Sequence, residues 1–208
     1  MTLARRRIEG TTRIEAFSDG VLAIIVTLLI FEVRLPEVAR GASSEEFWKA
    51  LVSIAPKFGS FALSFAAVAI YWVNHHHFFD GITHTDWKLL WLNNLLLFFL
   101  AIVPFTTAVL GDQLDQPIAI ALYALDLGLA AAAFTLMIRY VLFVGRLIDP
   151  AVSEATRRTE VRRSLIGTVI YLACIPIAFV LPGLALVFFV AIPITYVVPT
   201  LFAGDAPG

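Results

Sequence analysis

The stretch from Arg13 to Pro36 constrains the fold of this chain more than any other. It opens with charged and polar residues and then runs apolar from Val21 to Phe31, with Thr27 as the one interruption. From Phe17 to Leu35 it is long enough to cross a bilayer, which takes about 20 residues rising about 1.5 Å each. An acid such as Asp19, a few residues inside such a segment, is costly and by default marks a functional site or a paired structural one.

Composition extends this conclusion to the whole chain. Of the 208 residues, 60% are hydrophobic and 15% are charged, whereas a soluble domain has about 25% charged residues. A chain of this size cannot bury such an excess, so its apolar surface faces lipid, and its length predicts one domain, residues 1–208. The net charge of −1 gives no case for nucleic acid, and the single cysteine, Cys174, allows neither an internal disulfide nor a cysteine metal site.

Six apolar segments predict an all-α integral membrane protein with six transmembrane helices. They cover residues 17–35, 50–73, 89–110, 118–144, 165–181 and 184–202. The connections predicted between them are 36–46, 74–88, 111–117, 145–163 and a tight Pro182-Gly183 turn. Prolines at 104, 176, 193 and 199 lie inside three of the segments and predict kinks, which membrane helices tolerate.

The distribution of Lys and Arg predicts the orientation. With six spans both termini lie on one side, and that side carries eleven of the 15 basic residues: Arg5, Arg6, Arg7, Arg13, Lys88, Arg139, Arg146, Arg157, Arg158, Arg162 and Arg163. We therefore expect a multi-pass protein of the cell membrane with both termini in the cytoplasm. The run from Arg157 to Arg163 is interpreted as a solvated basic face, and contact with anionic lipid headgroups is an alternative.

The first segment has two different faces when drawn as a helix with about 100° per residue. Leu28, Phe31 and Leu35 fall within about 40° of Ile24, and Thr27 lies about 60° away, at the edge of this stripe. Ser18 and Asp19 lie across the helix from this apolar stripe. Such a stripe faces lipid, a neighbouring helix or a pore, and the residues alone leave these alternatives open.

The partner of Asp19 is expected to come from the second or third segment. Trp72, His75, His76 and His77 close the second segment, and Asn93 and Asn94 lie in the first turns of the third. A buried carboxylate needs hydrogen-bond donors, which Trp, His and Asn supply. The histidines, with His84, allow a structural network, a solvated loop or a metal site. Consecutive histidines point in different directions on a helix, which argues against the metal site.

The fourth segment carries two charged residues that are too far apart along one helix to pair. Arg139 lies near the cytoplasmic end and can extend its charge to the surface. Asp126 lies deeper, in the outer half, where it either pairs across helices or lines a cavity. A proton-coupled small transporter using Asp19, the cluster from His75 to His77 and Asp126 as a proton relay is therefore an alternative function.

Three stretches in the first half of the chain resemble one known family. They are Arg13-x-x-x-Phe17-Ser18-Asp19, the sequence YWVNHH at 71–76, and WLNN at 91–94 continuing to VPFTT at 103–107. They are similar to the endolysosomal-type potassium channels, in their bacterial and archaeal six-helix branch. The remaining helices match that family in number and hydrophobicity alone.

The resemblance implies a homotetramer in the bilayer in which the first helices line a central pore. It places the constriction at Ile24, Leu28 and Phe31, although Phe31 departs from the aliphatic residue usual in that family, and it places the Thr27 hydroxyl beside the gate. It also implies a polar network that fixes the pore helix to its neighbours, through Arg13, Phe17, Ser18, Asp19, Trp72, His75, His76, Asn93 and Asn94.

The function predicted on this basis is a potassium channel of modest selectivity. The permeant potassium ion is the one ligand expected, without a cofactor. No potassium-filter sequence of the TVGYG kind is present, so selectivity is expected from a tight hydrophobic constriction. No nucleophile–base pair or phosphate loop stands in a suitable context, so an enzyme is not expected.

Overall fold

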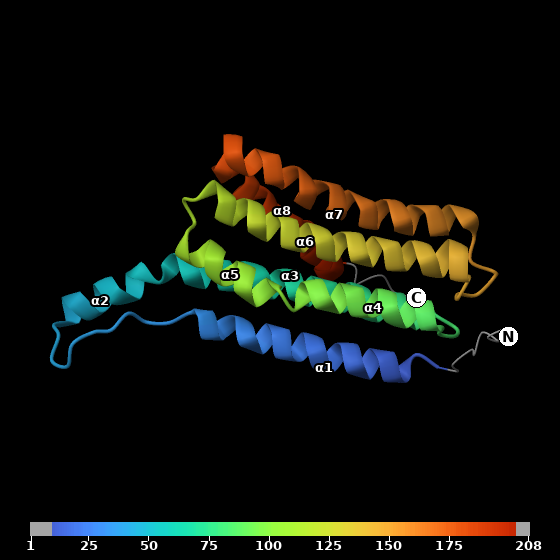
Figure 1. The fold of residues 1–208 in the computed structure, drawn as a ribbon, viewed down its shortest axis with the longest axis horizontal. Coiled ribbons are helices and arrows are strands. Elements are labelled where there is room, and N and C mark those ends of the chain that lie inside the picture. The colour runs from blue at the N-terminus through green and yellow to red at the C-terminus, as the bar shows by residue number, and fades with distance from the viewer. Residues whose placement is uncertain (1–9, 203–208) are drawn as a thin grey trace, which may run out of the picture.

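The computed structural model describes the backbone of residues 10–202 and the side chains of residues 10–194. Its long helices run side by side as an elongated bundle (Figure 1). The elements are α1 (Thr12–Leu28), η1 (Leu29–Glu32), α2 (Ser44–Ser53), α3 (Ala55–Asp80), α4 (Trp87–Leu100), α5 (Val103–Asp112), α6 (Pro117–Arg139), η2 (Tyr140–Gly145), α7 (Glu154–Val180) and α8 (Pro182–Phe202).

Five stretches of helix are long and apolar enough to cross a membrane among the described residues. They are Thr12–Glu32, Ala55–Asp80, Trp87–Asp112, Pro117–Gly145 and Glu154–Val180. The sixth predicted segment coincides with α8, which is apolar over Pro182–Ile194 and continues as a helix to Phe202. The predicted all-α membrane class is confirmed.

The first helix ends earlier than its apolar sequence suggests. The α-helix stops at Leu28, tightens into the short 3-10 helix η1, and leaves helical geometry at Val33. The Arg34 guanidinium donates a 3.1 Å hydrogen bond to the Phe31 carbonyl, which satisfies one of the free acceptors at this end. Leu35 is therefore outside the helix, although it was predicted within it.

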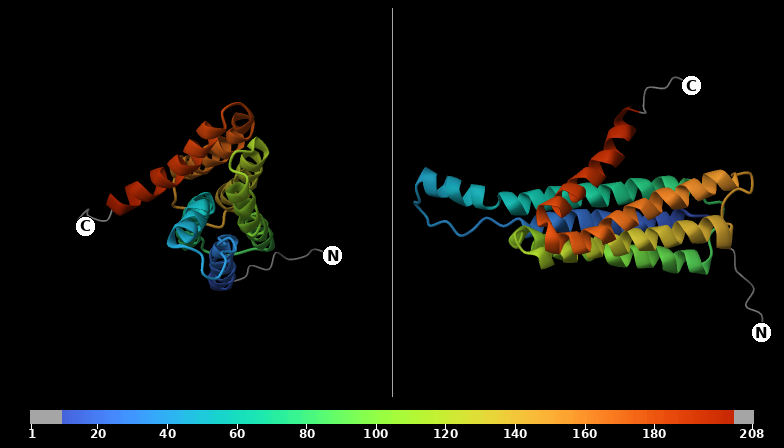
Figure 2. Two further views of the ribbon diagram at one scale, coloured as in Figure 1. Left: turned by 90° about the vertical axis from the view of Figure 1, so that its left-hand side faces the viewer. Right: turned by 90° about the horizontal axis from the view of Figure 1, so that it is seen from above.

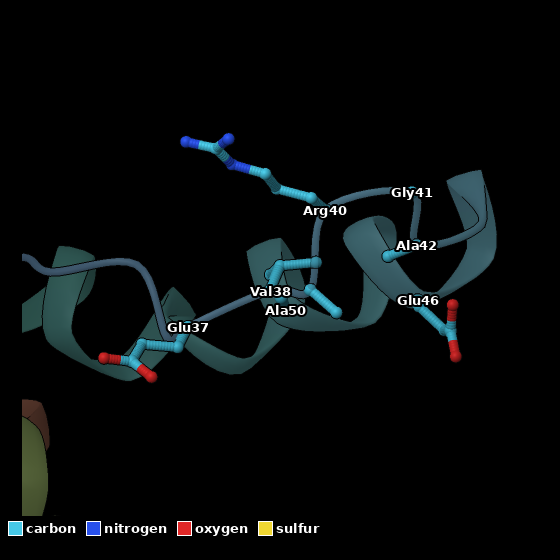
Figure 3. Close-up of a pocket in the computed structure, with 8 residues that line it drawn as sticks. Glu37, Val38, Arg40, Gly41, Ala42, Glu46 and Ala50 are labelled. Atoms are coloured by element: carbon cyan, nitrogen blue, oxygen red, sulfur yellow. The ribbon is translucent and has the colours of Figure 1, made fainter.

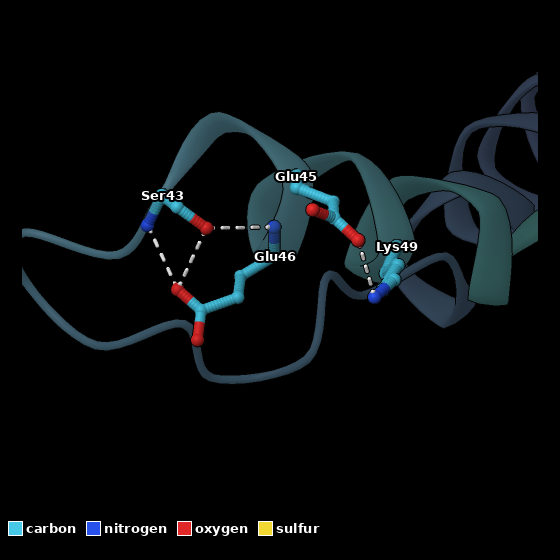
Figure 4. Close-up of polar contacts among 4 residues, drawn as sticks. All are labelled: Ser43, Glu45, Glu46 and Lys49. Atoms are coloured by element: carbon cyan, nitrogen blue, oxygen red, sulfur yellow. Dashed lines mark hydrogen bonds and ion pairs between the residues drawn. The ribbon is translucent and has the colours of Figure 1, made fainter.

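The second predicted segment is two helices instead of one. The helix α2 has its own capping box, in which Ser43 and Glu46 bond each other through backbone amides and side chains, and Lys49 pairs with Glu45 at 2.7 Å (Figure 4). Hydrogen bonds from Ser43 lower the pKa of the Glu46 carboxyl. A separate helix, α3, begins at Ala55 with a proline in its first turn, where the missing N–H costs nothing.

The third segment, predicted as one helix with a kink at Pro104, is two helices. The helix α4 ends at Leu100, and α5 begins at Val103 with Pro104 in its first turn. Proline lacks an N–H and its ring crowds the carbonyl four residues earlier, which here is that of Leu100. The break frees backbone groups close to Thr106 and Thr107, whose side chains matter below.

The central helix is α6, which packs against α4, α5, α7 and α8. Its contact with α7 uses small residues: a Cβ added at Gly128 would lie 2.7 Å from a methyl group of Leu172. Close approach of this kind is typical of helix pairs in membranes. Towards the end of the contact, the Thr135 hydroxyl lies 2.7 Å from that of Ser164.

The helix α7 begins at Glu154, much earlier than the predicted Leu165. Ser153 provides the N-cap, because its side chain accepts a hydrogen bond from the amide of Thr156. The second half of the predicted 145–163 connection is therefore helical, although it is polar. At the other end, Leu181 alone separates α7 from α8, which crosses the bundle at an angle in contact with α3, α6 and α7 before its last part projects outward (Figure 2).

Two connections meet beside the start of α1, at what we call the basic end of the bundle: residues 81–86 and residues 146–153 (Figure 1). Ile82 forms an isolated antiparallel bridge with Ile148, and the Thr83 amide donates a 2.8 Å hydrogen bond to the Leu147 carbonyl. The hydroxyl of Tyr140 donates to Asp86 Oδ2. These contacts lock α3, α4, α6 and α7 together at this end.

Candidate pore face and polar network

One face of α1 packs into the bundle and the other is free. The buried residues are Ile14, Ser18, Leu22 and Ile25, followed by Leu29 in η1. They recur at the spacing of three or four residues that defines one side of a helix. This face packs against α3, α4 and α5, so α1 is attached to the protomer along its length.

The opposite face carries the predicted constriction residues. The exposed fractions are 59% for Ile24, 44% for Leu28 and 63% for Phe31. Thr27 is exposed beside them, and its hydroxyl donates a 2.9 Å hydrogen bond to the Ile24 carbonyl. The structure therefore places the three apolar side chains and the hydroxyl on one outward-facing surface of the protomer.

A buried hydrogen-bonded chain joins α1 to α3 and α4. The amide nitrogen of the Asn93 side chain donates to Ser18 Oγ at 2.9 Å, and Asn93 Oδ1 lies 2.8 Å from Nε2 of His75. Ser18 in turn donates to the Ile14 carbonyl at 2.8 Å. The His75 ring stacks on Phe79 with centroids 4.3 Å apart. All three members of the chain, Ser18, Asn93 and His75, are buried.

Asp19 belongs to a different contact, although it follows Ser18 directly. Its Oδ1 accepts a 2.8 Å hydrogen bond from the indole nitrogen of Trp72, and both side chains are exposed in the protomer. The Trp72 ring stacks on His76 with centroids 6.0 Å apart. Of the donors considered for Asp19, Trp72 is the one that bonds it, whereas Asn93 bonds Ser18 and His75 bonds Asn93.

The remaining members predicted for the network lie at the surface. Arg13, Phe17, His76 and Asn94 are exposed, and Phe17 has an exposed fraction of 56%. No hydrogen bond joins the side chains of Arg13 or Asn94 to the buried chain in the part of the protein that the structure describes. In the same described residues, no group of three or more His, Cys, Asp or Glu side chains is placed to hold a metal ion.

A second buried polar cluster was not predicted as a unit. It joins α3, α5 and α6 through Ser64, Thr106, Thr107, Tyr123 and Asp126. The sequence signal was weak, since single hydroxyl residues in apolar helices commonly bond their own backbone. The structure settles one open alternative, because Asp126 pairs across helices: its Oδ2 lies 2.8 Å from Thr106 Oγ1.

The basic run contains one residue that is not simply solvated. The Arg157 guanidinium donates to the backbone carbonyls of Leu142 at 3.2 Å, Val152 at 3.0 Å and Pro150 at 3.4 Å. Arg157 thus holds the connection between η2 and α7 in place. This corrects the interpretation of Arg157 as part of a solvated face. Arg158 pairs with Glu154 on the exposed surface of α7.

A hollow beside α2 is lined by residues 37–42 with Glu46 and Ala50. Its charged side chains, Glu37, Arg40 and Glu46, point away from one another (Figure 3). A binding site for a small molecule needs polar groups that converge on the ligand. This hollow therefore carries no candidate site.

The membrane-spanning helices and the two faces of α1 together define the class of protein. It is a multi-pass α-helical membrane protein whose first helix is held by buried hydrogen bonds on one face and presents an apolar stripe on the other. The family described as the endosomal/lysosomal potassium channel TMEM175 matches residues 13–104, which include both the stripe and the buried chain.

Individual relatives match nearly the whole chain. A potassium channel of Streptomyces collinus is 37% identical over 179 residues, which cover 84% of this chain and 85% of that protein. A potassium channel of a Chryseobacterium species is 32% identical over 191 residues, covering 90% and 92%. The crystal structure of a lysosomal potassium-selective channel TMEM175 homologue from Chamaesiphon minutus matches with a TM-score of 0.79 at 28% identity, covering 90% of this chain and 96% of that one. The chain belongs to the TMEM175 potassium channel family, as the resemblance predicted.

Proposed function

We propose that this chain is the subunit of a potassium channel in which four copies surround a pore lined by α1. The observation that carries the proposal is the outward-facing stripe of Ile24, Leu28 and Phe31, on a helix whose other face is packed into the protomer. Relatives named as potassium channels match this chain over more than four-fifths of its length. We infer that one protomer has, in its described part, too few polar faces to hold a path for water and ions alone, so the path requires several copies.

The stripe then serves as the constriction. Four copies of Ile24, Leu28 and Phe31 form successive apolar rings, which gate by excluding water and remove part of the hydration shell of a passing ion. Thr27 provides a hydroxyl next to the Ile24 ring. Because no carbonyl filter replaces the lost water, we propose that selectivity for potassium over sodium is modest.

The buried chain and the Asp19–Trp72 contact hold the pore helix in position. Ser18, Asn93 and His75 connect α1 to α4 and α3, and Trp72 connects α3 to the neighbouring residue Asp19. Both contacts lie within two turns of Ile24 along α1. We assign them a structural role and place both termini on the cytoplasmic side, as the basic residues at that end favour.

Purified protein in liposomes tests this proposal. We expect unitary currents, and a potassium flux that follows the potassium gradient when no proton gradient is present. Native mass spectrometry of the detergent-solubilised protein is expected to give four times the 22.9 kDa of one chain. A flux that requires a proton gradient and saturates without unitary currents would instead identify the proton-coupled transporter.

A further inference from the structure

The polar cluster at the break between α4 and α5 has more hydrogen-bond acceptors than protons if Asp126 is ionised, as aspartate usually is. Thr106 Oγ1 lies 2.8 Å from Asp126 Oδ2 and 3.2 Å from the Val103 carbonyl oxygen. A threonine hydroxyl carries one proton. If Asp126 is ionised, both neighbours are acceptors without a proton, and one of these two contacts is left without a hydrogen.

The neighbouring hydroxyls form a second chain that ends at the same carbonyl. Tyr123 lies 3.0 Å from Ser64 Oγ, Ser64 lies 2.7 Å from Thr107 Oγ1, and Thr107 lies 2.6 Å from the Val103 carbonyl oxygen. Thr107 Oγ1 is the donor in both of its contacts, and each of these three side chains carries a hydroxyl proton of its own. The chain through Thr106 ends at the same carbonyl but has a carboxyl in place of a further hydroxyl, so it has a second proton only if Asp126 is a neutral acid.

The surroundings of Asp126 do not compensate a negative charge. The side chain is 5% exposed, and its second oxygen, Oδ1, has no hydrogen-bond partner. Asp126 makes no ion pair within the described part of the chain, where Lys57 of α3 pairs with Asp112 of α5 instead. A buried carboxylate with one hydrogen bond and no counter-charge is strongly disfavoured.

On the helices packed against α6, the described cations lie near the helix starts: Lys88 in the first turn of α4, and the four arginines between Arg157 and Arg163 in the first ten residues of α7. Tyr123 lies one turn before Asp126 on α6 and bonds Ser64, while α7 contributes the buried Tyr171 and Cys174. None of the three is a cation in any protonation state. A proton on Asp126 therefore finds a hydroxyl and a carbonyl as hydrogen-bond partners. An ionised Asp126 finds no cation at this site.

We propose that Asp126 is a proton-binding site and is a neutral carboxylic acid in the folded protein. Its Oδ2–H donates to Thr106 Oγ1, and the Thr106 hydroxyl donates to the Val103 carbonyl. The acid thus ties α6 to the first turn of α5, where Pro104 interrupts the backbone hydrogen bonding. This site is built from α5 and α6 of one protomer, so it stands independently of how many copies form the pore.

Infrared spectroscopy of the purified full-length protein tests the protonation state directly. We expect the carbonyl stretch of a protonated carboxyl group in the wild type at neutral pH, and its loss in Asp126→Asn. The asparagine retains a donor for Thr106 and is the conservative replacement for a neutral acid. If the wild type shows no such band, or if the band persists in a folded Asp126→Asn protein, the proposal is overturned.

A second variant decides the question even if Asp126→Asn fails to fold. Thr106→Val keeps the acid but removes its acceptor, so the same band is expected to persist and to move to higher frequency. Ser60→Ala is the matched control, because the Ser60 hydroxyl bonds its own helix at the Pro56 carbonyl; the band is expected at its wild-type position. An unmoved band in Thr106→Val would show that the proton is not donated to Thr106 and would overturn the assignment.

Discussion

The indole nitrogen of Trp72 donates a 2.8 Å hydrogen bond to Oδ1 of Asp19, and this contact joins α3 to α1 at the surface of the protomer. Ser18, the residue before Asp19, faces the interior and bonds Asn93. Two consecutive residues of α1 thus anchor this helix in two ways, one through an exposed pair and one through a buried chain. Their different surroundings predict different costs of substitution.

We expect the Asp19–Trp72 contact to contribute a modest coupling energy. A double-mutant cycle of Asp19→Ala with Trp72→Phe is expected to give about 0.5–1 kcal/mol, as for a typical net hydrogen bond near a surface. Asp19→Asn keeps an acceptor for the indole and is expected to lose less stability than Asp19→Ala. Thermal unfolding in detergent measures both. Variants that unfold like the wild type but change ion preference or pH response would assign Asp19 to permeation and revive the proton-relay alternative.

The buried chain is expected to cost more to break. Asn93→Ala leaves Nε2 of His75 without its partner and removes the donor to Ser18, and an unsatisfied buried group costs about 1–3 kcal/mol. Asn94→Ala is the matched control, because Asn94 is exposed. Thermal unfolding of the two variants is expected to differ clearly. Equal stability of Asn93→Ala and Asn94→Ala would contradict a structural role for the chain.

The sequence predicted the membrane helices because apolar length is a strong local signal, and it predicted a kink at Pro104, where the structure has a break, because proline acts on its own backbone. It did not predict where polar stretches become helical, as between Glu154 and Arg163, since caps such as Ser153 act over a few residues. The sequence also did not predict which side chains bond each other between helices. Ser18 and Asp19 differ by one position, and which of them is buried depends on how α1 is rotated against α3 and α4.

The orientation of the chain leads to a labelling experiment. Gln113→Cys lies between α5 and α6, and Thr159→Cys lies at the start of α7, so one membrane crossing separates them. We expect an impermeant maleimide to label Gln113→Cys in intact cells and Thr159→Cys after permeabilisation alone. The native Cys174 is buried and gives little background. Labelling of both positions in intact cells would contradict the topology, and the reverse pattern would invert the proposed orientation.

The apolar stripe leads to the sharpest test of the pore. Ile24→Asn places four amides, one from each copy, in the Ile24 ring of the proposed constriction, which is expected to admit water and raise the single-channel conductance severalfold. Leu28→Asn is expected to act in the same direction. Ile30→Asn is the matched control, because Ile30 is 44% exposed but lies about 120° around the helix from Ile24. Its conductance is expected to stay near the wild-type value. Currents that are unchanged in Ile24→Asn and Leu28→Asn, or raised equally in Ile30→Asn, would place the ion path on another face of the protomer.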